Sequence, residues 1–399
     1  MNSDHAKRIL QYLQTRQDDM VWLLSRCAQI ESPSTDPDAQ HQVFDVFEEC
    51  LRDLGFRCRR YSGQQSGGQL MAVAKELPRD QPKQLLLGHV DTVWPHGTLE
   101  TMPVESKEGC LHGPGVYDMK GGLVQAIFAL AALRQLGLQP SVTPVFFMNS
   151  DEEIGSRESA QHIRRLARIV DRAMIMEPSL GPSGELKTTR KGVGRFIVTV
   201  RGKAAHAGLN PEKGISAILE LSHVVQALFA LNDPDKGITV NVGTIDGGMR
   251  PNVVAPESRA EVDVRVRTHE DAAMIEKAIH SLEPSVPGTE LEIEGRIGRP
   301  PLESTPRNRR LWSRAQEAAD ALGIELDEGA AGGGSDGNWT SLYTATLDGL
   351  GAVGDGAHAV IEHVVEEKMP ERAALLACLI LGKTIAAKTG SEATQELEA

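Results

Sequence analysis

Residues 84–93, QLLLGHVDTV, join an apolar run to two polar side chains. The three leucines, followed by Gly88, predict a strand that is buried on both faces, as in a parallel sheet. His89 and Asp91 follow at strand spacing, so both side chains leave the same face at the carboxyl end of the strand. Open α/β sheets bind their ligands at that end. A single His-x-Asp is better explained by a loop histidine beside a solvated aspartate, so the prediction depends on whether the pattern recurs.

The pattern of an apolar run followed by acidic residues recurs twice along the chain. A strand predicted over residues 142–148 leads to three adjacent carboxylates at 151–153, DEE. Their charges repel one another unless a cation or solvent relieves them, so a metal site and a solvated acidic turn are the two readings. A further strand, predicted over 172–176, ends at Glu177 and a proline. The recurrence favours a shared site at one edge of a sheet.

Two glycine-rich regions carry further candidates. Asp118, in GPGVYDMKGG, lies just ahead of an apolar helix predicted over 123–136. An N-cap role would explain this aspartate on structural grounds alone. His358 lies in GDGAHAVIEHV. Gly333 and Gly334 belong either to a flexible loop or to a loop whose backbone N–H groups meet a substrate anion.

The hydrophobic pattern changes near residue 188. Residues 188–299 contain alternating strands and amphipathic helices, which are typical of a sheet covered on one face only. We therefore predict an inserted α+β domain there, with the proline-bearing segment GRPPLESTP as the return crossing. Residues 1–187 and 300–399 are expected to form one α/β domain, a mixed, largely parallel sheet sandwiched by helices.

Helical periodicity predicts helices near both ends of the chain. Apolar spacing over residues 5–24 fits one amphipathic helix, and residues 371–388 fit another. The residues from Gly390 onward, GSEATQELEA, have the composition of a disordered tail.

Composition argues against several partners. The net charge is −13 without any block of lysine or arginine, so nucleic acid and anionic membranes are not expected partners. The amino terminus lacks the apolar core of a signal peptide, and no run approaches membrane-spanning length. The five cysteines are scattered without a C-x-x-C pair, which is typical of reduced thiols in a cytoplasmic protein.

The candidate ligands are two imidazoles and four carboxylates: His89, Asp118, Glu152, Glu153, Glu177 and His358. Histidine and carboxylate ligands without thiolate suit zinc, with manganese or cobalt as substitutes. Two ions are the natural number for this many ligands. About two Zn²⁺ ions would be neutralised by three ligating carboxylates and one hydroxide, which makes burial of the site affordable.

These motifs resemble, in their order along the chain, those of the M20 family of zinc metallopeptidases. HVDTV, GPGVYDMKGG, SDEEIGS, the MEP step and GAH carry the resemblance, and AAHAG and GGMRPNVVAP extend it to the inserted region. It is closest to the glutamate carboxypeptidase (carboxypeptidase G2-like) branch. The resemblance implies a phosphorylase/hydrolase-like architecture, with a catalytic zinc-binding domain at 1–187 and 300–399 and a lid and dimerisation domain at 188–299.

The resemblance also implies how the metals are held. Asp118 bridges two zinc ions, with His89 and Glu177 on one ion and Glu153 and His358 on the other. Of two adjacent glutamates, one can bind metal while its neighbour handles the proton of the attacking water.

That neighbour is Glu152, the implied general base, and Asp91 supports the ligand His89. His206, in KAAHAG, is implied to stabilise the oxyanion, commonly from the partner subunit of a homodimer; without the resemblance it is better explained as a surface histidine. For the substrate carboxylate the resemblance points to four residues: Asn252, Arg265, Gly333 and Gly334.

The implied reaction is attack of a metal hydroxide on an amide bond next to a free carboxylate, which releases carboxyl-terminal glutamate from a small N-acyl or peptide-like substrate. An M20 deacylase that removes acetyl or succinyl groups is the alternative within the same family. A non-catalytic binding protein on the same fold is the alternative from another class, and its mark would be loss of Glu152 or of a ligand, all of which are present.

Overall fold

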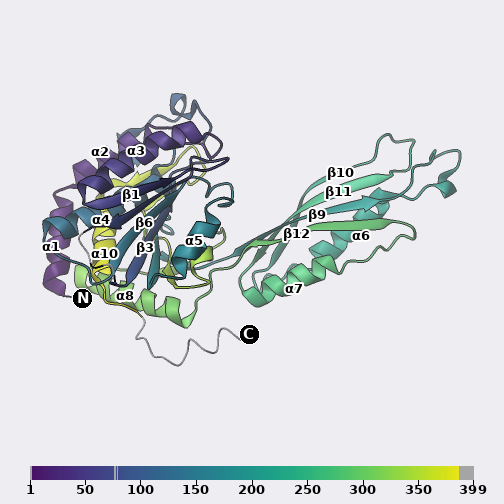
Figure 1. Cartoon of the computed structure of the whole chain (residues 1–399). Helices are drawn as coiled ribbons and strands as arrows, with labels where there is room; N and C mark the ends of the chain where they lie inside the picture. The colour runs from purple at the N-terminus through teal and green to yellow at the C-terminus, as the bar shows by residue number, and fades with distance from the viewer. Residues whose placement is uncertain (1, 76–77, 79, 386–399) are drawn as a thin grey trace. The chain divides into compact units, whose positions relative to one another are not determined.

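The computed structural model describes residues 2–75, 78 and 80–385 (Figure 1). The chain forms two compact units. The first combines Met1–Thr188, Ser304–Gly329 and Ser335–Ala399, and the second combines Thr189–Glu303 and Ala330–Gly334. The second unit thus includes a short glycine-rich segment that we had placed in the α/β domain. The tail predicted from Gly390 lies outside the described residues.

A six-stranded mixed sheet forms the centre of the first unit, in the order β1-β2-β6-β3-β7-β14. Strands β6, β3, β7 and β14 run parallel to one another, and β1 and β2 continue the sheet in antiparallel pairing. The largely parallel sheet predicted from the sequence is therefore confirmed. The strands are β1 (Phe56–Tyr61), β2 (Gln69–Ala74), β3 (Lys83–His89), β6 (Thr143–Asn149), β7 (Arg172–Ile175) and β14 (Ala345–Leu347).

Helices cover both faces of this sheet, as expected. Successive side chains of a strand point to opposite faces, and in β3 the buried Leu86 packs with one set of helices while the buried Leu85 and Leu87 pack with the other. The larger set is α1 (Ser3–Gln14), α2 (Gln17–Ala28), α3 (Pro37–Asp53), α4 (Gly121–Gln135), α8 (Pro306–Leu322) and α10 (Met369–Leu381). The smaller set is α5 (Ala160–Ala167) and α9 (Gly337–Thr340).

Two short sheets complete the description of the strands. One has the order β15-β16-β5-β4 and the other pairs β13 with β8. The strands are β4 (Glu105–Lys107), β5 (Cys110–His112), β8 (Leu186–Arg190), β13 (Glu328–Ala331), β15 (Gly354–Asp355) and β16 (His363–Val365).

The second unit is a four-stranded antiparallel sheet in the order β10-β11-β9-β12. Helices α6 and α7 lie on one face of it (Figure 1). Alternate residues Phe196, Val198 and Val200 of β9 are buried in the layer between sheet and helices. The α+β organisation read from the alternating pattern is confirmed. The elements are β9 (Gly192–Arg201), β10 (Thr239–Gly247), β11 (Glu257–Val266), β12 (Glu290–Arg299), α6 (Ala217–Phe229) and α7 (His269–His280).

Two helix predictions need correction. The single helix expected over 5–24 is two helices, α1 and α2, because the chain turns at Thr15 and Arg16. Helix α10 begins at Met369 and ends at Leu381, before Gly382, so the helix expected over 371–388 is shorter than predicted within the described residues.

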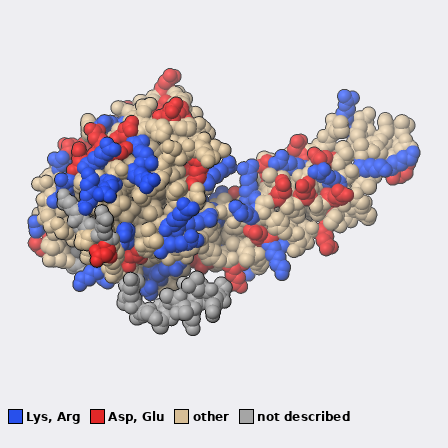
Figure 2. All heavy atoms as spheres, in the orientation of Figure 1, with Lys and Arg blue, Asp and Glu red and all other residues tan. Residues whose placement is uncertain are grey.

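By length and composition alone, one stretch among the described residues, Val116–Gln135, is long and apolar enough to cross a membrane, which corrects our reading that no run has this length. Its apolar window is 83% buried, because α4 packs in the core of the first unit. Figure 2 shows lysine and arginine interspersed with aspartate and glutamate on the visible surface of both units. Around α3 and β1, for example, Arg60 pairs with Asp45 and Glu48.

Candidate metal centre

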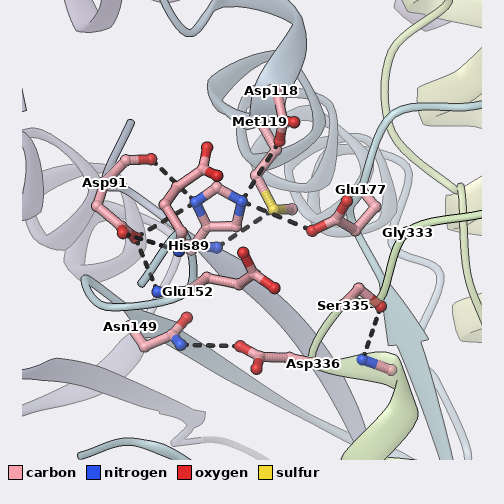
Figure 3. Close-up of polar contacts among 12 residues, drawn as sticks. His89, Asp91, Asp118, Met119, Asn149, Glu152, Glu177, Gly333, Ser335 and Asp336 are labelled. Carbon is pink, nitrogen blue, oxygen red and sulfur yellow. Dashed lines mark hydrogen bonds and ion pairs between the residues drawn. The ribbon is translucent and has the colours of Figure 1, made fainter. Parts of the chain in front are cut away.

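The carboxyl ends of three neighbouring parallel strands supply most of the candidate ligands. His89 is the last residue of β3, Glu152 and Glu153 follow β6, and Glu177 follows β7. The carboxyl ends of parallel strands meet at one edge of a sheet, which is why residues so distant in sequence converge there. Figure 3 shows the carboxyl groups of Asp118, Glu152 and Glu177 around the His89 ring.

Asp118 lies between two groups of ligand atoms. Its Oδ1 is 3.4 Å from Nε2 of His89, and its Oδ2 is 3.5 Å from Nε2 of His358. Each imidazole also faces one more carboxylate: Nε2 of His89 is 3.6 Å from Oε1 of Glu177, and Nε2 of His358 is 3.2 Å from Oε2 of Glu153. The five side chains therefore divide into two sets that share Asp118, one oxygen facing each set.

The N-cap explanation of Asp118 is wrong. Helix α4 begins at Gly121 with Lys120 at its N-cap position, and no side chain caps it. Asp118 instead lies in the preceding irregular turn, Val116–Lys120, whose Asp118–Met119 peptide is cis.

The donor set fits divalent metal ions. Ligand atoms of His89, Glu152 and Glu177 lie within 4.8 Å of one another, and so do those of His89, Asp118 and Glu153. Among the described residues, no donor hydrogen-bonds to the buried Oδ1 of Asp118 or Oε1 of Glu153. A buried carboxylate oxygen without a donor is costly, and a cation offers the missing partner.

Protonation in the metal-free protein reflects the crowding of these groups. Burial alone would lower the pKa of His89, but Asp118, Asp91 and Glu177 raise this pKa well above its usual value. Asp118 and then Glu153 raise the pKa of His358 to about 10. Burial raises the pKa of Glu153 to about 7, whereas the two imidazoles outweigh burial and hold the pKa of Asp118 well below its usual range. Protons thus occupy positions that metal ions would take.

Asp91 orders both the histidine and the glutamates. Nδ1 of His89 lies 2.9 Å from the backbone oxygen of Asp91, which accepts its proton and leaves Nε2 with the lone pair that a metal needs. The Asp91 carboxylate accepts the backbone N–H groups of Glu152 at 3.3 Å and Glu153 at 3.2 Å. The hydroxyl of Ser34 donates to the same carboxylate at 2.7 Å. Asp91 is fully buried, as a positioning residue must be to keep this geometry.

Glu362 is a supporting residue that the sequence reading did not single out. Its buried carboxylate accepts the backbone N–H groups of Gly115, Tyr117 and Asp118, each at 3.0 Å, and the indole N–H of Trp94 at 2.8 Å. It therefore fixes the turn that carries Asp118. The only signal in the sequence was an acidic residue in the apolar context AVIEHV.

Asp336 has a similar role beneath the Glu152 turn and was also missed. It accepts from the Asn149 amide at 2.8 Å and from the Ser156 hydroxyl, so it links the end of β6 to the turn that follows (Figure 3). Nothing in GGGSDG distinguishes this aspartate from an ordinary loop residue.

The remaining predicted residues lie in the second unit. His206 and Asn252 belong to adjacent segments, since His206 bridges to Val253 and the N–H of Ala207 donates to the Asn252 carbonyl at 3.0 Å. Nδ1 of His206 accepts the N–H groups of Gly208 and Leu209, so Nε2 carries the proton of the neutral ring and is a donor.

Arg265 and the glycine segment have different surroundings. The Arg265 guanidinium is held by both carboxylate oxygens of Asp263, at 2.8 and 3.0 Å. The carbonyls of Gly333 and Gly334 accept from Arg190 at 3.2 and 3.1 Å. The second unit thus brings His206 near Asn252 and brings the two glycines to Arg190.

Comparisons with known proteins agree with this geometry. The model of the peptidase family M20/M25/M40 matches residues 85–382. Carboxypeptidase G2 of Pseudomonas sp. is 28% identical over 376 residues, which cover 92% of this chain and 89% of that protein. A succinyl-diaminopimelate desuccinylase of Delftia acidovorans is 26% identical over 365 residues, 84% of this chain and 91% of that protein.

Solved structures show the same fold. The aminopeptidase PepT of Bacillus cereus superimposes with a TM-score of 0.76 at 21% identity, covering 92% of this chain and 98% of the other. An M20 family metallo-carboxypeptidase of Sulfolobus solfataricus gives 0.71 at 15% identity, with coverages of 91% and 98%. The family model spans most of the chain and includes every candidate ligand. The chain therefore belongs to the peptidase family M20/M25/M40 and is a metal-dependent hydrolase.

Proposed function

We propose that the protein hydrolyses an amide bond next to a free carboxylate and releases carboxyl-terminal glutamate from a small N-acyl or peptide-like substrate. The observation that carries the hydrolytic part is Asp118, whose two oxygens face the separate ligand pairs His89 with Glu177 and His358 with Glu153. The glutamate preference is supported by the similarity to carboxypeptidase G2 over 92% of the chain.

Five residues would hold two metal ions, with zinc as the proposed metal: His89, Asp118, Glu153, Glu177 and His358. When bound, such ions polarise a carbonyl oxygen and lower the pKa of water. The chain contributes the fixed geometry. Asp91 holds the His89 ring and the Glu152 turn, and Glu362 holds the Asp118 turn, so little reorganisation is needed during the reaction.

Glu152 is the proposed general base. It lies next to the ligand Glu153, and its carboxylate is within 4.8 Å of ligand atoms of His89 and Glu177. In this place the carboxylate can accept a proton from the attacking water and deliver it to the leaving amine nitrogen. The same group serves in both steps because it is a base before the attack and an acid after it.

The second unit is proposed to complete substrate binding. The Nε2–H of His206 is a donor suited to an oxyanion, and Asn252 is its neighbour in the fold. We also propose that the protein is a homodimer through this unit. Sedimentation of a monomer at micromolar concentration would contradict the dimer without affecting the hydrolytic proposal.

A substrate panel tests the proposal. Zinc-loaded protein is incubated with N-acyl and peptidyl forms of glutamate, aspartate and neutral amino acids, and the released amino acid is measured. Release of glutamate above the others is expected. Cleavage restricted to N-acetyl or N-succinyl amino acids would instead establish the deacylase activity, for which the desuccinylase relatives provide the support.

Glu152→Gln separates chemistry from folding. The amide keeps the size of the side chain but cannot take a proton, so kcat should fall by about 10²–10⁴-fold while the metal content stays unchanged. Glu100→Gln, at an exposed glutamate, is the matched control and should keep full activity. Unchanged kcat in Glu152→Gln would remove this residue from the mechanism.

A further inference from the structure

A row of two histidines between two carboxylates crosses the small sheet β15-β16-β5-β4. His363 of β16 is paired with His112 of β5. Glu105 of β4 is paired with His112, and Asp355 of β15 is paired with His363. Directly paired residues of antiparallel strands project from the same face of a sheet. The row therefore presents carboxylate, imidazole, imidazole and carboxylate on one face, and none of the four belongs to the metal centre described above.

The two imidazoles approach each other closely. Their ring centroids are 5.2 Å apart and the rings are inclined by 32°. Both histidines are half-buried, while Glu105 and Asp355 are exposed. Two imidazoles that bind one ion through nitrogen, at about 2.0–2.1 Å each for zinc, must be close neighbours, and this separation permits it.

A local hydrogen bond prepares His363 for metal binding. Its Nδ1 lies 2.9 Å from the backbone oxygen of Ile361. A carbonyl can only accept, so Nδ1 carries the proton and Nε2 keeps its lone pair. His89 has the same arrangement, with Nδ1 at 2.9 Å from the backbone oxygen of a residue two positions away. A ligating histidine almost always has such a partner on its other nitrogen.

We propose that His112 and His363 bind one divalent transition-metal ion, such as zinc, and that the exposed carboxylates of Glu105 and Asp355 on the same face favour the cation by their charge. Imidazole and carboxylate suit this class of ion. Cys110 lies two residues before His112 on β5, but burial and the nearby Glu366 and Glu108 raise the pKa of its thiol, which disfavours the thiolate that binds metal. The imidazoles are therefore the principal ligands.

The position of this site connects it to the catalytic ligands. Strands β15 and β16 flank the loop that contains His358, and β5 leads into the segment that contains Asp118. An ion held by His112 and His363 ties β5 to β16 at the base of both segments. Occupancy should therefore slow amide hydrogen exchange in the paired residues 363–365.

Equilibrium dialysis tests the site. The protein is first loaded with zinc at its catalytic centre and then dialysed against increasing Zn²⁺, and the bound zinc is counted for wild type, His112→Gln, His363→Gln and His41→Gln. His41 is an exposed histidine of α3 and is the matched control. Wild type and His41→Gln should bind one ion more than the other two, whose affinity for that ion should fall by more than about tenfold. Equal binding by all four proteins, or loss of the ion in His41→Gln, would overturn the proposal.

Two further measurements keep the test independent of catalysis and of folding. His358→Gln should weaken zinc binding at the catalytic centre and leave the ion of His112 and His363 in place; simultaneous loss of that ion would contradict a separate site. Should a histidine variant fail to fold, electron paramagnetic resonance of Cu²⁺ added to the zinc-loaded wild type gives the answer. Coupling to two imidazole nitrogens supports the proposal, and its absence overturns it.

Discussion

Asp118 is the central residue of the candidate metal centre, because its two carboxylate oxygens face two different histidines, His89 and His358. In the metal-free protein its carboxylate raises the pKa of both His89 and His358, to about 10 for His358. The imidazole of His358 therefore holds a proton at neutral pH. A metal ion binds only the neutral imidazole, so binding at His358 must release a proton.

Metal affinity should consequently rise with pH. Between pH 6 and 8, below the raised pKa of His358, each displaced proton makes the apparent affinity about tenfold stronger per pH unit. Calorimetric titration of zinc in buffers with different ionisation enthalpies counts the protons released. In His358→Gln the number should fall by about one. An affinity independent of pH in wild type would contradict the protonation described here.

Asp91 offers a second test at the level of one side chain. Asp91→Asn replaces a carboxylate that accepts the N–H groups of Glu152 and Glu153 by an amide whose NH₂ end cannot accept them. We expect metal affinity or kcat to fall by about 10- to 100-fold. Ser34→Ala removes one hydrogen bond to the same carboxylate and should cost only about 1 kcal/mol of stability. Equal effects of the two substitutions on kcat would show that Asp91 does not position the glutamates.

Among the elements, helix α4 packs closely against the backbone that follows β7. A Cβ on Gly122 would lie 1.9 Å from the backbone oxygen of Met176, the residue before Glu177. Gly122→Ala should therefore force the helix from the strand, at about 1–3 kcal/mol of stability, and weaken metal binding through Glu177. Urea unfolding and zinc titration measure both effects. At Gly298 a Cβ meets nothing within 4 Å, so Gly298→Ala should change neither; normal stability of Gly122→Ala would contradict the close packing.

Local sequence patterns predicted the elements whose packing is uniform. The apolar run before His89 predicted a strand buried on both faces, and β3 (Lys83–His89) is that strand. Local patterns failed to predict a helix boundary that depends on tertiary contacts. Helical spacing continues across Thr15 and Arg16, although the chain turns there.

In the candidate site, too, the sequence predicted features that depend on neighbouring residues and missed those that depend on residues far along the chain. Ligand types after strand ends are visible in sequence, because the strand pattern and the side-chain chemistry are both local. Glu362 could not be recognised, since its role depends on three N–H groups about 245 residues earlier in the chain. The two pairs of ligands that share Asp118 were likewise implied only by resemblance, because spacing in sequence does not determine which ligands meet.

At the scale of the whole molecule, the second unit is an insertion whose two crossings lie side by side. The N–H groups of Arg190 and Leu302 each donate to the carbonyl of the other residue at 3.0 Å. The first unit has its own core on both faces of its sheet. Because the two crossings are adjacent and the first unit has its own core, we expect the first unit to fold after the inserted residues are deleted.

Replacing residues 192–300 by a short Gly-Ser linker should leave a folded protein that binds metal with the stoichiometry of the full chain. Hydrolysis should fall by at least about 100-fold, because the proposed donor His206 is removed. Circular dichroism, metal analysis and the substrate panel give the three readouts. Retained hydrolysis would show that the second unit is dispensable for the chemistry, and loss of metal binding would show that the first unit does not stand alone.

The discontinuity of the first unit also dictates an order of events on the ribosome. His358 is translated some 180 residues after Glu177, which at about 5–20 residues per second is a delay of roughly 10–40 s. During that delay the nascent chain carries four clustered carboxylates with a single imidazole, and the turn of Asp118 still lacks Glu362. The second unit, made of Thr189–Glu303 and Ala330–Gly334, emerges before either partner arrives. The proposed ligand set would therefore be completed only late in synthesis, and a chain truncated before residue 358 would lack one of the five proposed ligands.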